Sequence, residues 1–131
     1  MPAKESLYPR DWFNKALQDV RTVEILLRAQ GDAEVAGFHL QQAAEKYLKG
    51  YLLSQGWKLE RIHNLEALLN EAIRFDPGFE RFRDLCEEAT DLYTFERYPF
   101  FGRPGVSLDD IARLLPLLND LIQKIEETVA R

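Results

Sequence analysis

Four polar residues, His39, Gln42, Lys46 and Lys49, follow one another at spacings of three, four and three within the segment HLQQAAEKYLKG (39–50). On an α-helix these spacings place all four side chains within an arc of about 80°, so that they form one polar stripe. An imidazole and two ammonium groups side by side can hold an anionic ligand or an acidic partner surface. The stripe is therefore a candidate binding surface.

A purely structural interpretation of this stripe stays open. Glu45 lies four residues before Lys49, the spacing at which an ion pair forms along a helix, and charged stripes commonly face solvent. Catalysis by the stripe alone is not expected, because it contains no nucleophile and no carboxylate that would orient His39. We therefore predict no catalytic residue in it.

His63, which directly precedes Asn64 at a predicted helix start, is the second of only two histidines. It could serve as a neighbour of the cap, a general base or a ligand-binding group. No metal site is predicted, since the chain lacks a His-x-x-x-His pair and an acidic cluster of ligand spacing. The single cysteine, Cys86, reads as a small buried residue. No cofactor is expected.

A second candidate site is the segment FERYPFFGRPGV (95–106), which combines arginines with aromatic residues. Arg97 and Tyr98 are its candidate binding residues, because guanidinium and aromatic groups stack on bases and hold phosphates. The alternative is a hydrophobic plug that covers one end of the fold, with the arginines turned outward.

The elements that position these residues are predicted to be helices throughout. Apolar residues recur at helical spacing, and no alternating strand pattern is present. Pro9, Asp32, Asn64, Asp76-Pro77 and Ser107 mark five helix starts, and the helix at about 33–55 is expected to be central because its apolar arc is wide. Pro116 should kink the last helix. We predict an all-α, antiparallel up-and-down bundle of four long helices and one short one, forming a single domain over residues 1–131.

The last predicted helix carries more apolar residues than one packing seam needs. They are Leu108, Ile111, Leu114, Leu115, Leu117, Leu118, Leu121, Ile122, Ile125 and Val129. Either the helix is deeply buried, or a second face pairs with another copy. We expect a homodimer.

Composition limits the classes of partner. The chain has 131 residues and a formal net charge of −5, which argues against a dedicated nucleic-acid-binding protein, and no DNA partner is expected. No apolar run approaches the roughly 20 residues of a membrane helix, and the first residues lack the apolar core of a signal peptide. A cytoplasmic protein without membrane contact is expected.

The chain resembles the HEPN domain family of higher eukaryotes and prokaryotes. The resemblance rests on Trp12 and Ala16, on FHLQQAAEKYLKGYLLSQG (38–56), on HNLEALL (63–69) and on ERYP (96–99). It implies an antiparallel bundle that dimerises. It also implies a minimal nucleotidyltransferase, encoded nearby, as the partner in a module of the toxin–antitoxin type.

Toxic members of that family are metal-independent ribonucleases with an arginine followed, after four to six residues, by a histidine. Arg97 stands where the family has its arginine, but positions 98–108 contain no histidine. The leading hypothesis is therefore a non-catalytic homodimer that binds a nucleotidyltransferase, with a nucleotide or RNA as a further ligand. The alternative is a ribonuclease in which folding or dimerisation brings His39 or His63 to Arg97.

Overall fold

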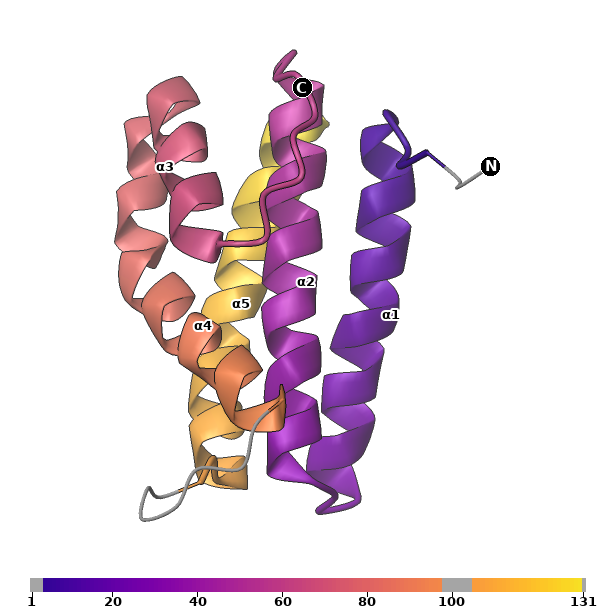
Figure 1. Ribbon diagram of the computed structural model, residues 1–131, viewed down its shortest axis with the longest axis vertical. Helices are drawn as coiled ribbons and strands as arrows, with labels where there is room; N and C mark the ends of the chain where they lie inside the picture. The colour runs from indigo at the N-terminus through magenta and orange to yellow at the C-terminus, as the bar shows by residue number, and fades with distance from the viewer. Residues whose placement is uncertain (1–3, 98–104, 131) are drawn as a thin grey trace.

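The computed structural model describes residues 4–97 and 105–130, with the side chains of 4–92 and 105–130. Within these ranges the chain is helical and contains no strand, so the all-α prediction is confirmed (Figure 1). The elements, in order, are α1 (Pro9–Arg28), α2 (Ala33–Ser54), α3 (Leu65–Phe75), the 3-10 helix η1 (Pro77–Phe82), α4 (Arg83–Arg97) and α5 (Leu108–Val129).

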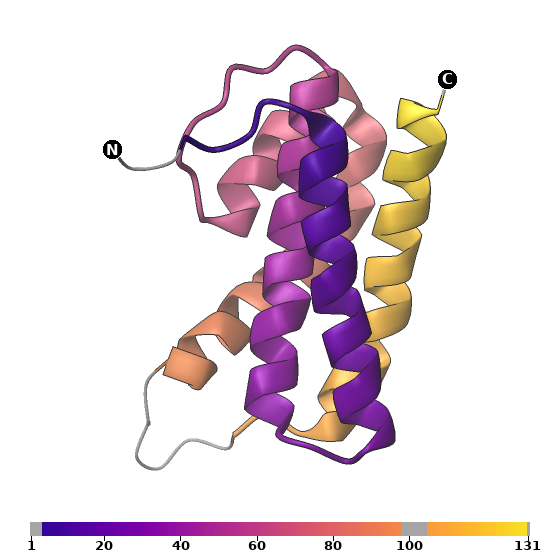
Figure 2. The ribbon, with the colours of Figure 1, turned by 90° about the vertical axis from the view of Figure 1, so that its right-hand side faces the viewer.

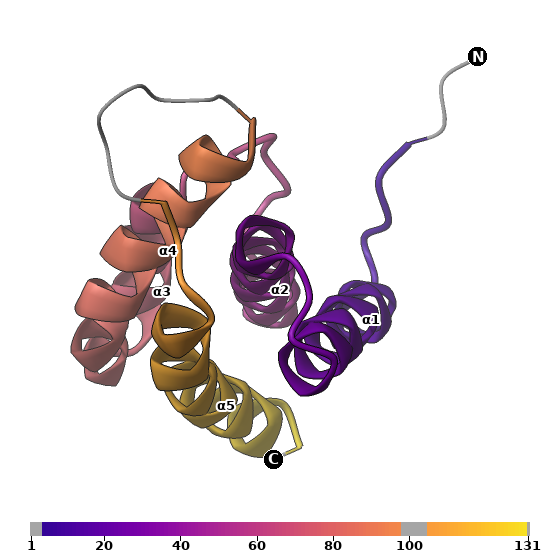
Figure 3. The ribbon, with the colours of Figure 1, turned by 90° about the horizontal axis from the view of Figure 1, so that it is seen from below.

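Helix α2 lies at the centre of the molecule, as its wide apolar arc predicts. It packs against α1, α3, α4 and α5, and the end-on view of Figure 3 shows it with α1 to its right, α3 and α4 to its left and α5 below. The residues of its wide apolar arc are almost completely buried; they are Ala36, Leu40, Ala43, Ala44, Tyr47, Leu48, Tyr51 and Leu52. Figure 2 shows α1 and α2 running side by side along most of their length.

The predicted helix starts at Asp32, Asn64 and Ser107 are confirmed. The Asp32 side chain accepts hydrogen bonds from two backbone N–H groups of α2, and Asn64 does the same for α3. Ser107 and Asp110 form a reciprocal capping box at the start of α5. Each cap satisfies backbone donors that have no partner inside the helix.

The turn after α1 contains one residue in the left-handed region and one glycine packed closely against a side chain. The left-handed residue is Gln30, with a φ of 52°. A Cβ at Gly31 would lie 2.7 Å from Cδ2 of Leu26, so that the Leu26 side chain would have to shift to accommodate it. Gly56, with a φ of 85°, does end α2 in the conformation that favours glycine.

The fourth predicted helix begins as the 3-10 helix η1 and becomes α-helical only at Arg83. The Phe79 N–H donates to the Asp76 carbonyl three residues earlier. In a 3-10 helix the side chains at i and i+3 lie above each other. This geometry turns both Phe79 and Phe82 into the core, where they are 0% and 4% exposed.

Most of the apolar surplus of α5 is buried within a single chain. Ile111, Leu114, Leu118, Leu121 and Ile125 belong to the core, whereas Leu115, Ile122 and Val129 pack against its edge. Leu117 stays 40% exposed. Of the two explanations for the apolar surplus, burial within one chain therefore accounts for most of these residues, and a second face that pairs with another copy is not needed for them. Among the described residues no helix is both long enough and apolar enough to cross a membrane.

The Asp76 carboxylate links η1 to α5 and should make stability depend on acid. Lys124 Nζ donates to Asp76 Oδ2 over 2.9 Å, and the Gly78 N–H donates to Oδ1 over 2.8 Å. The Lys124 hydrogen bond, followed by that from Gly78, lowers the pKa of Asp76. A lowered folded-state pKa stabilises the protein above the unfolded value of about 3.9, and this contribution is lost as pH falls through the folded value.

We therefore expect Asp76→Asn to lose less stability than the wild type between neutral pH and about pH 3. Urea denaturation at the two pH values measures this difference. Asp120→Asn, at an exposed position of α5, is the control and should keep the wild-type dependence. An acid dependence that is unchanged in Asp76→Asn would contradict the role of this carboxylate.

Candidate functional site

Asp19 of α1 joins two residues of the predicted polar stripe. Its Oδ1 lies 2.8 Å from Nδ1 of His39, and its Oδ2 accepts a 2.7 Å hydrogen bond from Nζ of Lys46. Asp19 itself is only 7% exposed. We call Asp19, His39 and Lys46 the Asp19 cluster. The Asp19 cluster connects α1 to the middle of α2 by two polar contacts at the edge of the core.

The Asp19 cluster corrects the expectation that no carboxylate orients His39. Asp19 lies twenty residues earlier in the chain, so spacing along α2 does not reveal it. A signal for it does exist in α1. Asp19 follows the buried Ala16 by three residues and precedes the buried Val23 by four, which places a carboxylate on the apolar face. A buried carboxylate on such a face needs a partner.

Lys49 and His63 meet at a second carboxylate. Glu45 Oε2 lies 3.7 Å from Nζ of Lys49 and 3.5 Å from Nδ1 of His63. Nζ of Lys49 also lies 5.2 Å from the centre of the Trp12 ring. The ion pair between Glu45 and Lys49, which the structural interpretation of the stripe requires, is thus present. Lys49 is 1% exposed, and this burial argues against direct contact with a ligand.

Gln42 and the Arg97 segment complete the predicted binding residues. Gln42 is partly exposed, and its Nε2 donates to Oε1 of the buried Gln41 over 2.7 Å. Arg97 is the last residue of α4, and its side chain lies outside the described ones. Tyr98 also lies outside the described residues. Contact between the Arg97 segment and the stripe therefore stays a prediction.

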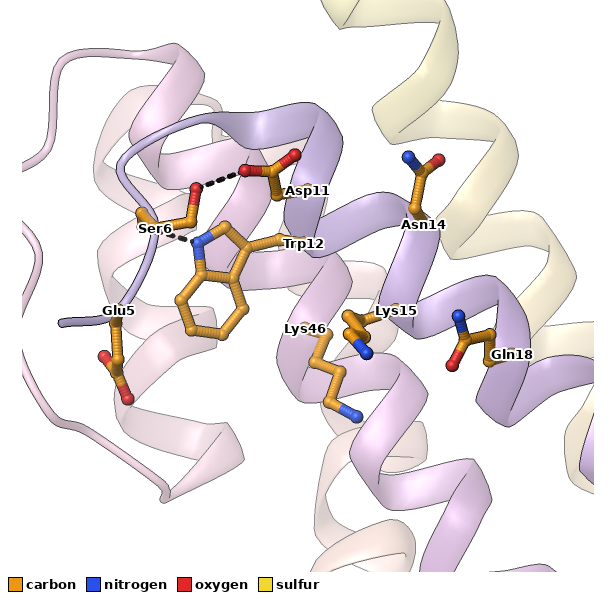
Figure 4. Close-up of a pocket in the computed structure, with 8 residues that line it drawn as sticks. All are labelled: Glu5, Ser6, Asp11, Trp12, Asn14, Lys15, Gln18 and Lys46. Atoms are coloured by element: carbon orange, nitrogen blue, oxygen red, sulfur yellow. Dashed lines mark hydrogen bonds between the residues drawn. The ribbon is translucent and has the colours of Figure 1, made fainter. Parts of the chain in front are cut away.

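A pocket opens beside the Asp19 cluster, between α1, the segment before it and α2 (Figure 4). Its volume is about 460 Å³, within the range of small-molecule sites. Its lining residues are Glu5, Ser6, Asp11, Trp12, Asn14, Lys15, Gln18 and Lys46. Of these, only Lys46 was predicted as a binding residue. The pocket also depends on Glu5 and Ser6, which precede α1, and the sequence does not specify where this segment lies.

The described residues offer no other obvious chemical centre. No group of three metal-ligating side chains occurs within residues 4–97 and 105–130. Cys86 is buried, as predicted. Burial in the core raises the pKa of Cys86 to about 12, so that its thiol stays protonated at neutral pH.

Cys86 is accordingly expected to be unreactive in the folded protein. At about pH 8 the thiolate population should be roughly a thousandfold below that of an exposed cysteine, and access is blocked as well. A colourimetric thiol reagent should release less than one equivalent from the native protein over hours, and one full equivalent after guanidinium is added. Rapid native reaction would show that the core opens at Cys86.

Comparisons with known proteins agree with this architecture. A family model described as the HEPN domain matches residues 9–128. The crystal structure of an archaeal HEPN homologue superposes with a TM-score of 0.68 at 23% identity, covering 93% of this chain and 98% of that one. At this level of identity the likeness shows the shared fold alone. No curated protein matches the chain significantly. Because the family model spans nearly the whole sequence, this protein belongs to the HEPN domain family.

Proposed function

We propose that this protein is a non-catalytic HEPN homodimer, built from two antiparallel up-and-down bundles, which binds a minimal nucleotidyltransferase encoded nearby. A nucleotide is its proposed small ligand. The pair would act in the cytoplasm as a module of the toxin–antitoxin type.

The observation that carries the non-catalytic assignment is the position of the two histidines. Both precede Arg97 in the chain, so neither completes the arginine–histidine motif of the family ribonucleases. Both are also in contact with carboxylates, His39 with Asp19 and His63 with Glu45. The Glu45–His63 contact supports a structural role for His63, since it joins the segment before α3 to α2.

The surface proposed for the second copy and for the partner lies on the exposed parts of the helices. Leu117 is 40% exposed on α5. Ile25 of α1 and Val35 of α2 are exposed near the turn that joins these helices. Apolar side chains of this size, when they gather at a surface, favour protein–protein contact.

Light scattering after gel filtration tests the assembly directly. The purified protein alone should elute at twice the mass of one chain, and adding the product of the neighbouring nucleotidyltransferase gene should give a larger complex. Leu117→Asp should weaken one of these two contacts, whereas Ala112→Asp, also exposed on α5, should leave both intact. A monomer that binds neither the partner nor nucleotides at micromolar concentration would overturn the proposal.

A ribonuclease is the second candidate function, and the Asp19–His39 pair is the observation in its favour. A carboxylate that holds Nδ1 orients an imidazole for proton transfer at Nε2. The histidine side chain is 29% exposed. In this candidate Nε2 would take the proton of an RNA 2′-hydroxyl, whose oxygen then attacks the adjacent phosphate. The bond from phosphorus to the 5′-oxygen of the next nucleotide would break, leaving a 2′,3′-cyclic phosphate, and the released 5′-oxygen would take a proton from water.

Cleavage of RNA in the presence of chelator distinguishes the two functions. Activity that disappears in both His39→Ala and Arg97→Ala would establish the ribonuclease. Equal activity in the variants would indicate a contaminating nuclease.

A further inference from the structure

The pocket beside Trp12 has a wall that is built by hydrogen bonds. The indole N–H of Trp12 donates to the Ser6 carbonyl over 2.9 Å, which fixes both the ring and the segment before α1. The Ser6 hydroxyl donates to Oδ2 of Asp11 over 2.7 Å and accepts from the Tyr8 N–H over 3.0 Å. Figure 4 shows this segment curving beside the indole ring. The pocket is therefore a preformed feature of the fold.

The Trp12 ring offers a stacking surface to this pocket. Buried Lys49 lies over the ring at 5.2 Å from its centre and does not line the pocket, so it covers the ring from inside the molecule. The rest of the partly exposed ring contributes to the pocket wall. A fixed indole ring stacks well on planar groups, and stacking on nucleic-acid bases is sequence-tolerant.

The charges around Trp12 are separated in space. Figure 4 shows the ammonium groups of Lys15 and Lys46 on one side of the ring and the Glu5 carboxylate on the other. Lys46 is already paired with Asp19. Among the described residues no ion pair is found for exposed Lys15. The Asp11 carboxylate is turned toward Ser6. A complementary ligand is planar, anionic at one end and a hydrogen-bond donor at the other.

We propose that this pocket binds a nucleoside monophosphate whose base carries an exocyclic amino group. The base stacks on Trp12, the phosphate lies against Lys15 and Lys46, and the amino group donates to Glu5. A carboxylate accepts a hydrogen bond from the amino group of cytosine and has no donor for the carbonyl that uracil carries at the same position. This inference rests on the proposed nucleotide binding and gives it a location and a base preference.

Fluorescence of Trp12 tests the proposal. The chain contains two tryptophans, so Trp57→Phe leaves Trp12 as the only one. Titration of this variant with CMP should give saturable quenching, whereas UMP should bind at least about tenfold more weakly because one charge-assisted hydrogen bond is lost. Cytidine, which lacks the phosphate, should also bind about tenfold more weakly. Inorganic phosphate alone should not change the emission. Absence of saturable quenching by CMP, or equal affinity for CMP and UMP, would overturn the proposal.

Substitutions in the same background locate the two ends of the ligand. Lys15→Glu should weaken CMP binding by about tenfold or more, since it reverses the charge that faces the phosphate. Glu5→Gln should remove most of the preference for CMP over UMP. Lys58→Glu, at an exposed lysine outside the pocket, is the matched control and should bind as the parent does. CMP binding that is unchanged in Lys15→Glu would place the nucleotide elsewhere.

The same variants separate this inference from the wider proposed function. Lys15→Glu and Glu5→Gln are mixed with the nucleotidyltransferase in the gel-filtration assay. A complex that forms without any CMP binding at Trp12 would overturn the pocket assignment alone. CMP binding without a complex would overturn the partner assignment alone.

Discussion

Replacing Gly50 with valine is expected to lower the free energy of unfolding by about 3 kcal/mol, at the upper end of the effects of overpacked cores. A Cβ at Gly50 would lie 2.5 Å from Cε1 of Phe13. The Phe13 ring is fully buried and stacks on Tyr47 with 5.3 Å between the ring centres. Because these rings fill the contact between α1 and α2, the added side chain can be accommodated only if the two helices separate.

Urea denaturation followed by circular dichroism measures this effect. Arg21→Val is the control, because it places the same β-branched residue at an exposed position of α1 and should cost less than about 1 kcal/mol. If the clash is the cause, Phe13→Ala combined with Gly50→Val should be no less stable than Phe13→Ala alone. Full additivity of the two losses would show that Gly50 is required for another reason.

The parts of the fold that depend on local signals could be predicted from the sequence. Asp32, Asn64 and Ser107 cap helices because their side chains reach backbone N–H groups two or three residues ahead. The wide apolar arc of α2 likewise indicated its central position, since a helix with apolar residues over half its surface needs neighbours on several sides. Such signals lie within one turn or one helix.

The parts that depend on contacts between distant segments could not be predicted in the same way. The 3-10 start of the fourth helix follows from how Phe79 and Phe82 enter the core. The pocket follows from the contact of Trp12 with Ser6, six residues earlier, at a helix start whose orientation the sequence does not specify. Spacing along one helix gives no information on either feature.

The polar stripe shows the same limit at the candidate site. The sequence predicts that its four side chains lie on one face of a helix, but it does not predict the partners of these side chains. His39 and Lys46 share Asp19 of α1, and Lys49 turns inward between Glu45 and Trp12. His39 and Lys46 thus contribute to the contact between α1 and α2, and Lys46 also lines the pocket. The proposed binding pocket and the contact between α1 and α2 therefore share Lys46.

Asp19→Ala is expected to cost about 3 kcal/mol of folding free energy, the range seen when one member of a buried charge pair is removed. The substitution leaves Nζ of Lys46 and Nδ1 of His39 without the carboxylate that each contacts at 2.7 and 2.8 Å. Both side chains are less than one-third exposed, 24% for Lys46 and 29% for His39, so water replaces the lost partner only in part. Glu24→Ala, at an exposed acidic position of the same helix, is the control and should be nearly neutral.

A double-mutant cycle separates the interaction energy between Asp19 and Lys46 from the other effects of removing the Asp19 carboxylate. Lys46→Met keeps the aliphatic stem and removes the charge, so the combination with Asp19→Ala should be less destabilised than the sum of the two single variants. Asp19→Ala should also reduce the affinity for CMP, measured by quenching of Trp12, but by less than Lys15→Glu does. Without Asp19 the Lys46 ammonium group is less well positioned, yet its charge is no longer paired and can interact with the phosphate. An Asp19→Ala variant as stable as Glu24→Ala would show that the Asp19 cluster does not hold α1 on α2. His39 and Lys46, the two stripe residues that contact Asp19, would then be available to a ligand.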